Sequence, residues 1–142
     1  MRFALITALI LSACATPYQE IGINGGVTAE QVSSDTWRIM SRGNVATSKA
    51  SVADYAMLKA AEITRQQGGT HFIIVSATDA ANDDIGTPAL LRDYRPQSAK
   101  AYKPGQDTVV RVLTVKPGAK PPTGAMSADD VLRITGARVE RG

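Results

Sequence analysis

Three kinds of side chain in this sequence have the reactivity for nucleophilic, acid–base or metal chemistry: one thiol, one imidazole and a run of carboxylates. Cys14 is the only cysteine and His71 the only histidine among 142 residues. A thiolate is a nucleophile and a soft metal ligand, and an imidazole titrates near neutral pH. Asp79, Asp83 and Asp84 lie close together in the sequence and carry the hard oxygen ligands that Ca²⁺ prefers. The surroundings of each residue decide which of these chemistries applies.

The spacing of these residues does not match a metal or catalytic motif. A single histidine cannot form a two-histidine zinc site. The three aspartates lack both the spacing of a calcium loop and the glutamate that closes one. Ser48 and Lys49 are adjacent rather than three residues apart, as a serine–lysine nucleophile pair requires. We therefore expect no metal, no cofactor and no catalytic residue, and interpret His71 as a hydrogen-bonded structural residue.

Cys14 stands at the end of a segment with the composition of an export signal. Arg2 is followed by a run, Phe3–Leu11, in which Thr7 is the only polar residue, and two small residues, Ser12 and Ala13, precede the cysteine. About nine apolar residues reach halfway across a bilayer as a helix, so the run is too short for a transmembrane span. The sequence predicts a signal peptide over residues 1–13 that is removed.

The four residues at this junction, Leu11, Ser12, Ala13 and Cys14, resemble the bacterial lipobox: Leu, a small residue, Ala or Gly, then Cys. The resemblance implies a diacylglyceryl group on the Cys14 thiol, cleavage between Ala13 and Cys14, and acylation of the new amine with a fatty acid such as palmitate. Three acyl chains form a permanent anchor. Lipidation would also consume the only thiol, which excludes a disulfide. In lipoproteins of this kind an Asp after the Cys retains the protein in the inner membrane; Ala15 stands there instead, which implies the outer membrane.

The remaining chain has the length and balance of one small domain. Its formal charge of +3 falls by one when Arg2 leaves with the signal, which is too small a basic excess to indicate a nucleic-acid partner. Residues 14–26 contain three glycines and little periodicity, and we interpret them as a lipidated tether. Residues 27–142 are then a single α+β domain.

Alternation and capping signals predict the elements of this domain. Extended runs are expected at 27–32, 36–43, 70–78 and 108–116, with a turn at 33–35 between the first two. A helix over 51–67 is expected to begin with a capping box of Ser51 and Asp54 and to end at Gly68, and a short helix follows a second capping signal at Ser127. The order ββαββα predicts a two-layer α+β sandwich with a small mixed sheet, in which the unbroken apolar run of 70–78 is central, buried on both faces and parallel to 36–43.

Two surfaces are candidates for a partner. Tyr55, Leu58 and Glu62 are expected on the exposed side of the main helix, unless that side packs on the tether. The segment 92–103 of the long loop 79–107 is basic and contains tyrosines, and its candidate contact residues are Arg92, Tyr94 and Arg95, with Lys100, Tyr102 and Lys103 beside them. Such a loop is suited to anionic lipid or a cell-wall polymer, unless it is simply solvated.

The block from Trp37 to Phe72 is similar to one in a family of alphaproteobacterial envelope lipoproteins. The similarity is carried by Gly43, Asn44, the segment 54–62 (DYAMLKAAE), Gly69 and Phe72. It implies a lipid-anchored periplasmic domain and supplies no chemistry. We expect a non-enzymatic binding or structural module whose partners are the membrane and an envelope protein or cell-wall polymer. The alternative is a small periplasmic hydrolase or carbohydrate-acting enzyme that uses Asp79 and Asp83.

Overall fold

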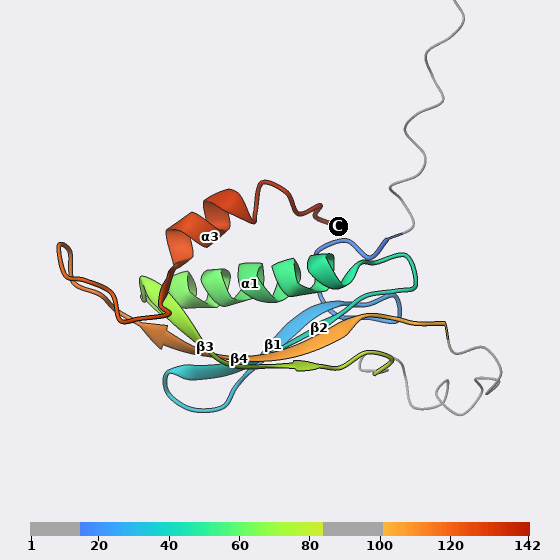
Figure 1. The fold of residues 1–142 in the computed structure, drawn as a ribbon, viewed down its shortest axis with the longest axis horizontal. Helices are drawn as coiled ribbons and strands as arrows, with labels where there is room; N and C mark the ends of the chain where they lie inside the picture. The colour runs from blue at the N-terminus through green and yellow to red at the C-terminus, as the bar shows by residue number, and fades with distance from the viewer. Residues whose placement is uncertain (1–14, 84–100) are drawn as a thin grey trace, which may run out of the picture.

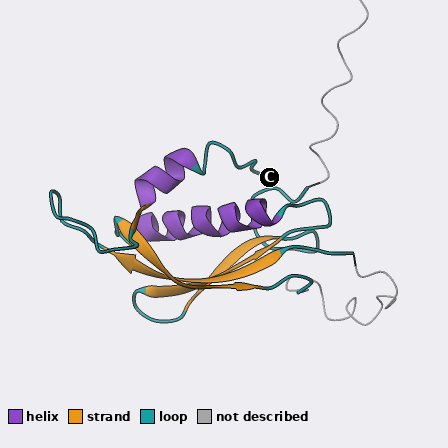
Figure 2. Ribbon diagram, viewed as in Figure 1, coloured by secondary structure: helices purple, strands orange, loops and turns teal. Residues whose placement is uncertain are grey.

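The computed structural model describes residues 15–83 and 101–142. Along the chain the elements are β1 (Gly26–Gln31), β2 (Thr36–Arg42), α1 (Lys49–Gln66), β3 (His71–Asp79), β4 (Gly105–Leu113), β5 (Met126–Ser127) and α3 (Ala128–Ile134). Both helices lie on one side of the sheet, and α1 lies between the sheet and α3 (Figures 1 and 2). The predicted α+β sandwich with one main helix and a short C-terminal helix is confirmed.

The sheet is antiparallel throughout its ladders, in the order β1-β2-β4-β3-β5. The prediction of a mixed sheet is therefore wrong. Strands β2 and β3 do run in the same direction, as expected for the two ends of a crossover, but β4 inserts between them and pairs with both. The order of strands in a sheet cannot be read from the local sequence. Alternation of side chains predicts a strand but does not indicate which other strand it pairs with.

Strand β3 is neither central nor buried on both faces, contrary to the prediction from its apolar run. Phe72 is fully buried against the helix side, while Val75 is 54% exposed. The ladder register shifts between Ile74 and Ser76, so Val75 occupies a β-bulge. A bulge inserts one extra residue and interrupts the alternation of faces. The continuous apolar run thus reflects a bulge in a one-sided strand.

Helix α1 begins two residues earlier than predicted. Ser48, rather than Ser51, is the N-cap, and its hydroxyl accepts a hydrogen bond from the Ser51 amide at 3.0 Å. The predicted end is confirmed: Gly68 has a φ of +75°, which favours glycine, and the Gly69 amide closes back on the Thr64 carbonyl at 2.8 Å. The Ser127 cap of α3 is also confirmed, with its hydroxyl accepting from the Asp130 amide.

The segment before β1 is packed into the domain, so its interpretation as a tether is wrong for the described residues. Thr16 is 1% exposed and Tyr18 is 8% exposed. The Tyr18 amide donates to the Glu140 carbonyl at 2.7 Å, and the Val27 amide donates to the Gln19 carbonyl at 2.8 Å. This segment therefore runs between the C-terminal segment and the edge of β1. Within residues 15–83 and 101–142, no helix combines the length and apolar character needed to span a bilayer.

Candidate functional site

The helix face expected to be exposed is covered. Tyr55 is 5% exposed and Leu58 is fully buried, because α1 packs on the sheet with one side and on α3 and the N-terminal segment with the other. The Tyr55 hydroxyl donates to the Thr16 carbonyl at 2.5 Å, and Glu62 accepts from the Tyr18 hydroxyl at 2.6 Å. Burial raises the pKa values of both tyrosines. The expected exposure of Tyr55 and Leu58 is wrong, and the alternative that this side packs on the N-terminal segment is confirmed.

Several predicted positions lie outside the described residues. These are the cleavage and lipidation residues Ala13 and Cys14, and the loop residues Asp84, Arg92, Tyr94, Arg95 and Lys100. The described ends of the loop are hydrogen-bonded to each other: the Asn82 amide donates to the Lys103 carbonyl, and the Lys103 amide donates to the Asn82 side chain, both at 2.9 Å. Strands β3 and β4 extend to Asp79 and from Gly105, which shortens the predicted loop at both ends.

The two carboxylates of the hydrolase alternative are each paired with a different cation. Asp79 lies 3.3 Å from the Lys49 ammonium and accepts from the Ala81 amide, and these contacts lower its pKa. Asp83 lies 2.8 Å from the guanidinium of Arg42. A general acid needs a raised pKa, so the environment of Asp79 is the opposite of the one required. In the part of the chain that the structure describes, no three His, Cys, Asp or Glu residues gather as a metal site.

Three cavities in the described part of the chain are small and have a mixed polar and apolar lining. One of about 130 Å³ lies where the first turn of α1 meets the ends of β3 and β4, another of about 190 Å³ lies beside Thr16 and Arg138, and a shallow one of about 290 Å³ lies along α3. Sites for drug-sized ligands and cofactors have about 300–1,000 Å³. The two smaller hollows fit water or a small group, and the shallow one along α3 is at the lower limit of that range.

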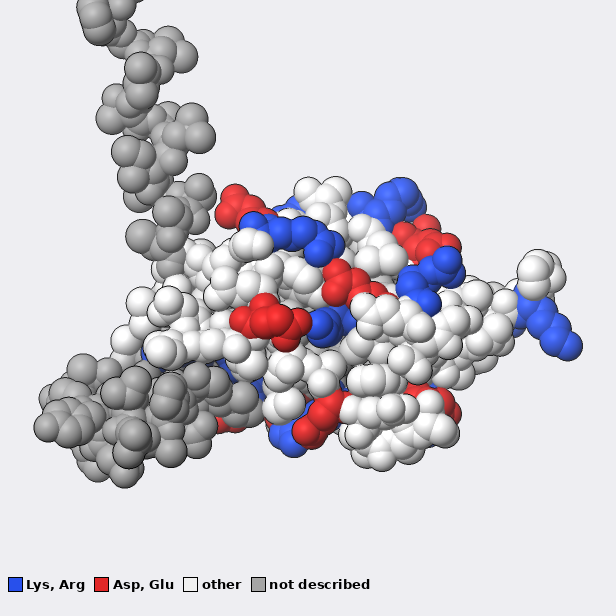
Figure 3. Space-filling view, turned by 180° about the vertical axis from the view of Figure 1, so that it is seen from behind, with Lys and Arg blue, Asp and Glu red and all other residues white. Residues whose placement is uncertain are grey.

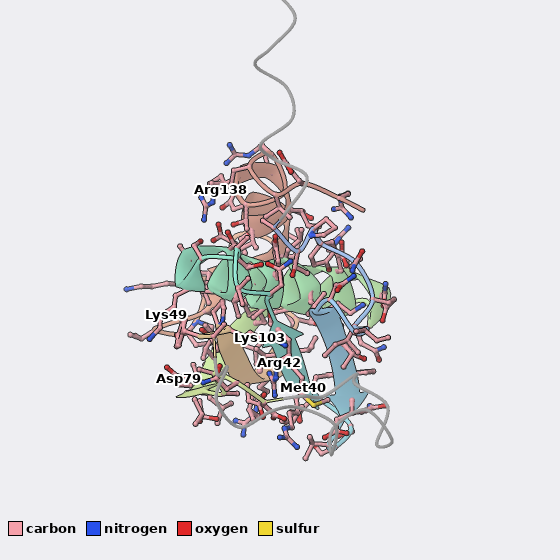
Figure 4. The ribbon with its side chains drawn as sticks, turned by 90° about the vertical axis from the view of Figure 1, so that its right-hand side faces the viewer. Met40, Arg42, Lys49, Asp79, Lys103 and Arg138 are labelled. Carbon is pink, nitrogen blue, oxygen red and sulfur yellow. The ribbon has the colours of Figure 1, made fainter. Side chains whose placement is uncertain are left out.

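A charged cluster that the sequence did not reveal lies on the sheet face opposite the helices. Its centre is Arg42, 3% exposed, which lies 2.8 Å from Asp107 and also donates to the carbonyls of Ser41 and Gln106. Arg38 lies 2.6 Å from the other oxygen of Asp107. Figure 4 shows Arg42 near the middle of the sheet, with Lys49 and Asp79 to one side. Alternation of side chains along a strand places Arg38 and Arg42 on one face of β2. This spacing was the sequence signal that could have indicated a charged cluster on that face.

The cluster holds Asp107 ionised. Partial burial alone would raise the pKa of Asp107, but hydrogen bonds and positive charge from Arg38 and Arg42 outweigh burial, and the pKa is lowered. The pairs tie β2, β4 and Asp83, in the segment after β3, together, which is a structural role. Elsewhere basic and acidic side chains are interspersed on the surface, as Figure 3 shows from behind.

The second feature that the sequence did not reveal is a hydrogen-bond clamp on Thr16. Its amide donates to the Thr47 hydroxyl at 3.0 Å, its hydroxyl donates to the Asn24 carbonyl at 2.5 Å, and the Asn44 amide donates to the same hydroxyl at 2.9 Å. With the Tyr55 contact, Thr16 is bound to two turns and to α1. This set of contacts, the Thr16 clamp, fixes the chain two residues after Cys14.

No family model, curated protein or solved structure matches this chain.

Proposed function

We propose that the protein is a lipid-anchored bacterial envelope protein whose domain faces the periplasm, in the outer membrane, and acts as a non-enzymatic binding or structural module. The observation that carries this proposal is the adjacency of two features. The lipobox-like residues end at Cys14, and the first clamped residue of the fold is Thr16, 1% exposed. Cleavage before Cys14 would therefore remove the signal while leaving the clamped fold whole.

The environment of the carboxylates supports the non-enzymatic half of the proposal. Asp79 and Asp83 are paired with Lys49 and Arg42 respectively, and the pKa of Asp79 is lowered. A hydrolase that uses two carboxylates needs one of them protonated near neutral pH. The environments of Asp79 and Asp83 therefore do not favour the hydrolase alternative.

The partner class is proposed from the remaining candidate surface. Tyr55 and Leu58 are buried, which leaves the basic loop with Arg92, Tyr94 and Arg95. Tyr102, in the described part of this loop, is 48% exposed. An envelope protein, an anionic polymer or anionic lipid suits a basic segment that contains aromatic residues.

The test compares three versions of the full-length protein in cells: wild type, Cys14→Ala and Ser12→Ala. Ser12→Ala keeps a small residue in the lipobox pattern and is the matched control. With an alkyne fatty acid as the label, wild type and Ser12→Ala should be labelled and migrate as the cleaved form. Cys14→Ala should be unlabelled and retain the signal. Fractionation should place the labelled forms in the outer membrane, and labelled Cys14→Ala would refute the assignment.

The same strains test the binding half. In-cell crosslinking followed by affinity capture and mass spectrometry should yield one stoichiometric envelope partner with wild type. A partner lost with Cys14→Ala would depend on the local concentration that the membrane provides. A partner retained by both would bind the domain itself. No partner with either version would contradict the binding role and leave the structural one.

A further inference from the structure

The end of the domain where residue 15 lies carries a group of exposed apolar side chains. Among the described residues the large hydrophobic side chains that are most exposed are Ile23, Val32, Val45, Val75, Tyr102 and Ile134. Ile23 and Val45 belong to the two turns that the Thr16 clamp holds, since Asn24 and Asn44 are the backbone partners of the Thr16 hydroxyl. Both side chains are about three-fifths exposed, at 62% and 61%.

Hydrogen bonds hold both turns in fixed conformations, so the backbone positions of Ile23 and Val45 are fixed. In the first turn, Gly22 and Gly25 exchange backbone hydrogen bonds of 3.0 Å in both directions. In the second, the Asn44 side chain accepts from the Ala46 amide and from the Thr47 hydroxyl. A single exposed aliphatic residue is ordinary, but exposed apolar side chains gathered on neighbouring turns can mark a surface that contacts an apolar phase.

The short chain between Cys14 and Thr16 determines how far the domain can lie from the membrane that would hold the lipid anchor. Two residues of extended chain span at most about 7 Å, so a lipidated Cys14 would hold Thr16 within that distance of the lipid headgroups. Lys49, with its side chain 69% exposed, and Tyr102 lie at the same end, where the Lys49 ammonium stands 5.6 Å from the Tyr102 ring centre. Lysine and tyrosine place an apolar body in the interface and a polar tip in water.

We propose that this end of the domain sits directly on the phospholipid bilayer, with Ile23 and Val45 in the interface and no free tether between the lipid and the fold. The proposal rests on the proposed lipidation of Cys14. The surface that this end of the domain contacts is the lipid bilayer in which the anchor is inserted. The domain consequently has one orientation relative to the membrane.

The test uses the full-length lipidated protein reconstituted into phospholipid vesicles, with single cysteines introduced as Ile23→Cys and Val45→Cys. Because Cys14 is the only native cysteine and its thiol is blocked by lipid, an environment-sensitive fluorophore labels only the new site. Val32→Cys is the matched control, since Val32 is 62% exposed and lies in the turn between β1 and β2, at the other end of β1 from Gly26. Thermal unfolding confirms that each labelled variant is folded.

Labels at 23 and 45 should emit at shorter wavelength in vesicles than in water and be quenched by lipids that carry a doxyl group, while the label at 32 should do neither. Equal behaviour of all three labels would overturn the proposal, as would a wavelength shift at 23 and 45 without quenching by lipid, which would indicate a protein partner or a second copy. Unmutated protein is labelled in parallel: a reactive Cys14 thiol would refute lipidation, whereas a blocked thiol with unquenched labels would refute only the seating.

Discussion

Removing the Thr16 hydroxyl should destabilise the whole domain, although Thr16 lies in a segment without strand or helix pattern. Thr16→Val keeps the shape and removes a hydroxyl that makes two hydrogen bonds. The Asn44 amide retains the Thr47 hydroxyl as a partner at 3.1 Å, so the Asn24 carbonyl bears most of the loss. A buried polar group without a partner costs about 1–3 kcal/mol, and with the second lost bond we expect about 2–3 kcal/mol.

The assay is chemical and thermal unfolding, followed by circular dichroism, of residues 14–142 carrying Cys14→Ser. For a domain of this size about 1 kcal/mol corresponds to roughly 3–5 °C in Tm, so Thr16→Val should lower Tm by about 6–15 °C. Thr16→Ser is the matched control, because it keeps the hydroxyl and loses one methyl group, worth about 1 kcal/mol.

Tyr55→Phe tests the same clamp from the other side. It removes the hydroxyl that donates to the Thr16 carbonyl and should cost about 1–2 kcal/mol. Because both changes act on one network, the double variant should deviate from additivity by more than about 0.5 kcal/mol. If Thr16→Val and Tyr55→Phe each changed stability by less than about 0.5 kcal/mol, as substitutions in a free tether would, the reasoning would be refuted.

Two further substitutions test side-chain contacts of β4. The lowered pKa of Asp107 means that its ionised form stabilises the folded state above the unfolded pKa of about 3.9, and that this contribution is lost as pH falls through the folded value. Asp107→Asn should therefore cost about 1–3 kcal/mol at pH 6 and make unfolding less sensitive to pH below about 4; an unchanged acid profile would contradict this. A methyl group at Gly69 would stand 2.5 Å from a β4 side chain, so Gly69→Ala should lower the free energy of unfolding by about 1–3 kcal/mol. Gly22→Ala, which meets nothing within 4 Å, should change the unfolding midpoint little, and equal effects of the two substitutions would argue against the packing.

Features carried by neighbouring residues were predictable from the sequence. The Ser127 cap, the glycine stop after α1 and the turn at 33–35 each depend on contacts within a few residues, and all three are present. The hairpin turn is closed by the Val32 amide, which donates to the Thr36 carbonyl at 2.8 Å. Local propensity and capping chemistry decide such features before any tertiary contact forms.

Features that depend on distant partners were not predictable. The 100° helical period correctly separated two sides of α1, but it could not reveal that α3 and the N-terminal segment cover the second side and bury Tyr55 and Leu58. Thr16 likewise finds its partners 8, 28, 31 and 39 residues away. A polar residue in a stretch without periodicity has no local signal for such burial. Alternation along β2 places Arg38 and Arg42 on one face, but it does not indicate that Asp107 of β4 lies beside them.

The position of the basic loop in the fold favours lipid over cell-wall polymer as its target. The loop is attached at the end that carries the Thr16 clamp, because the Gly43 amide, beside Asn44, donates to the Pro104 carbonyl at 2.8 Å, and Figure 4 views Lys103 and Arg42 from that end. Helix α1 is 18 residues long, so its C-terminal end lies about 27 Å from its N-terminal end.

Residues 92–103 carry four basic side chains and one aspartate, and a basic segment held near a bilayer gains about 1 kcal/mol per basic residue from anionic lipid, within a Debye length of the surface. Replacing Arg92, Arg95, Lys100 and Lys103 with Gln should therefore reduce co-sedimentation of the domain, residues 14–142 with Cys14→Ser, with anionic vesicles and leave its binding to isolated sacculi unchanged. The matched control replaces Lys116 and Lys120, which follow β4 beyond Leu113 at the far end of the strand from Gly105. A selective loss of sacculus binding would instead make the loop a cell-wall contact, and it would also place that contact at the end of the domain that the lipid anchor is expected to hold against the membrane.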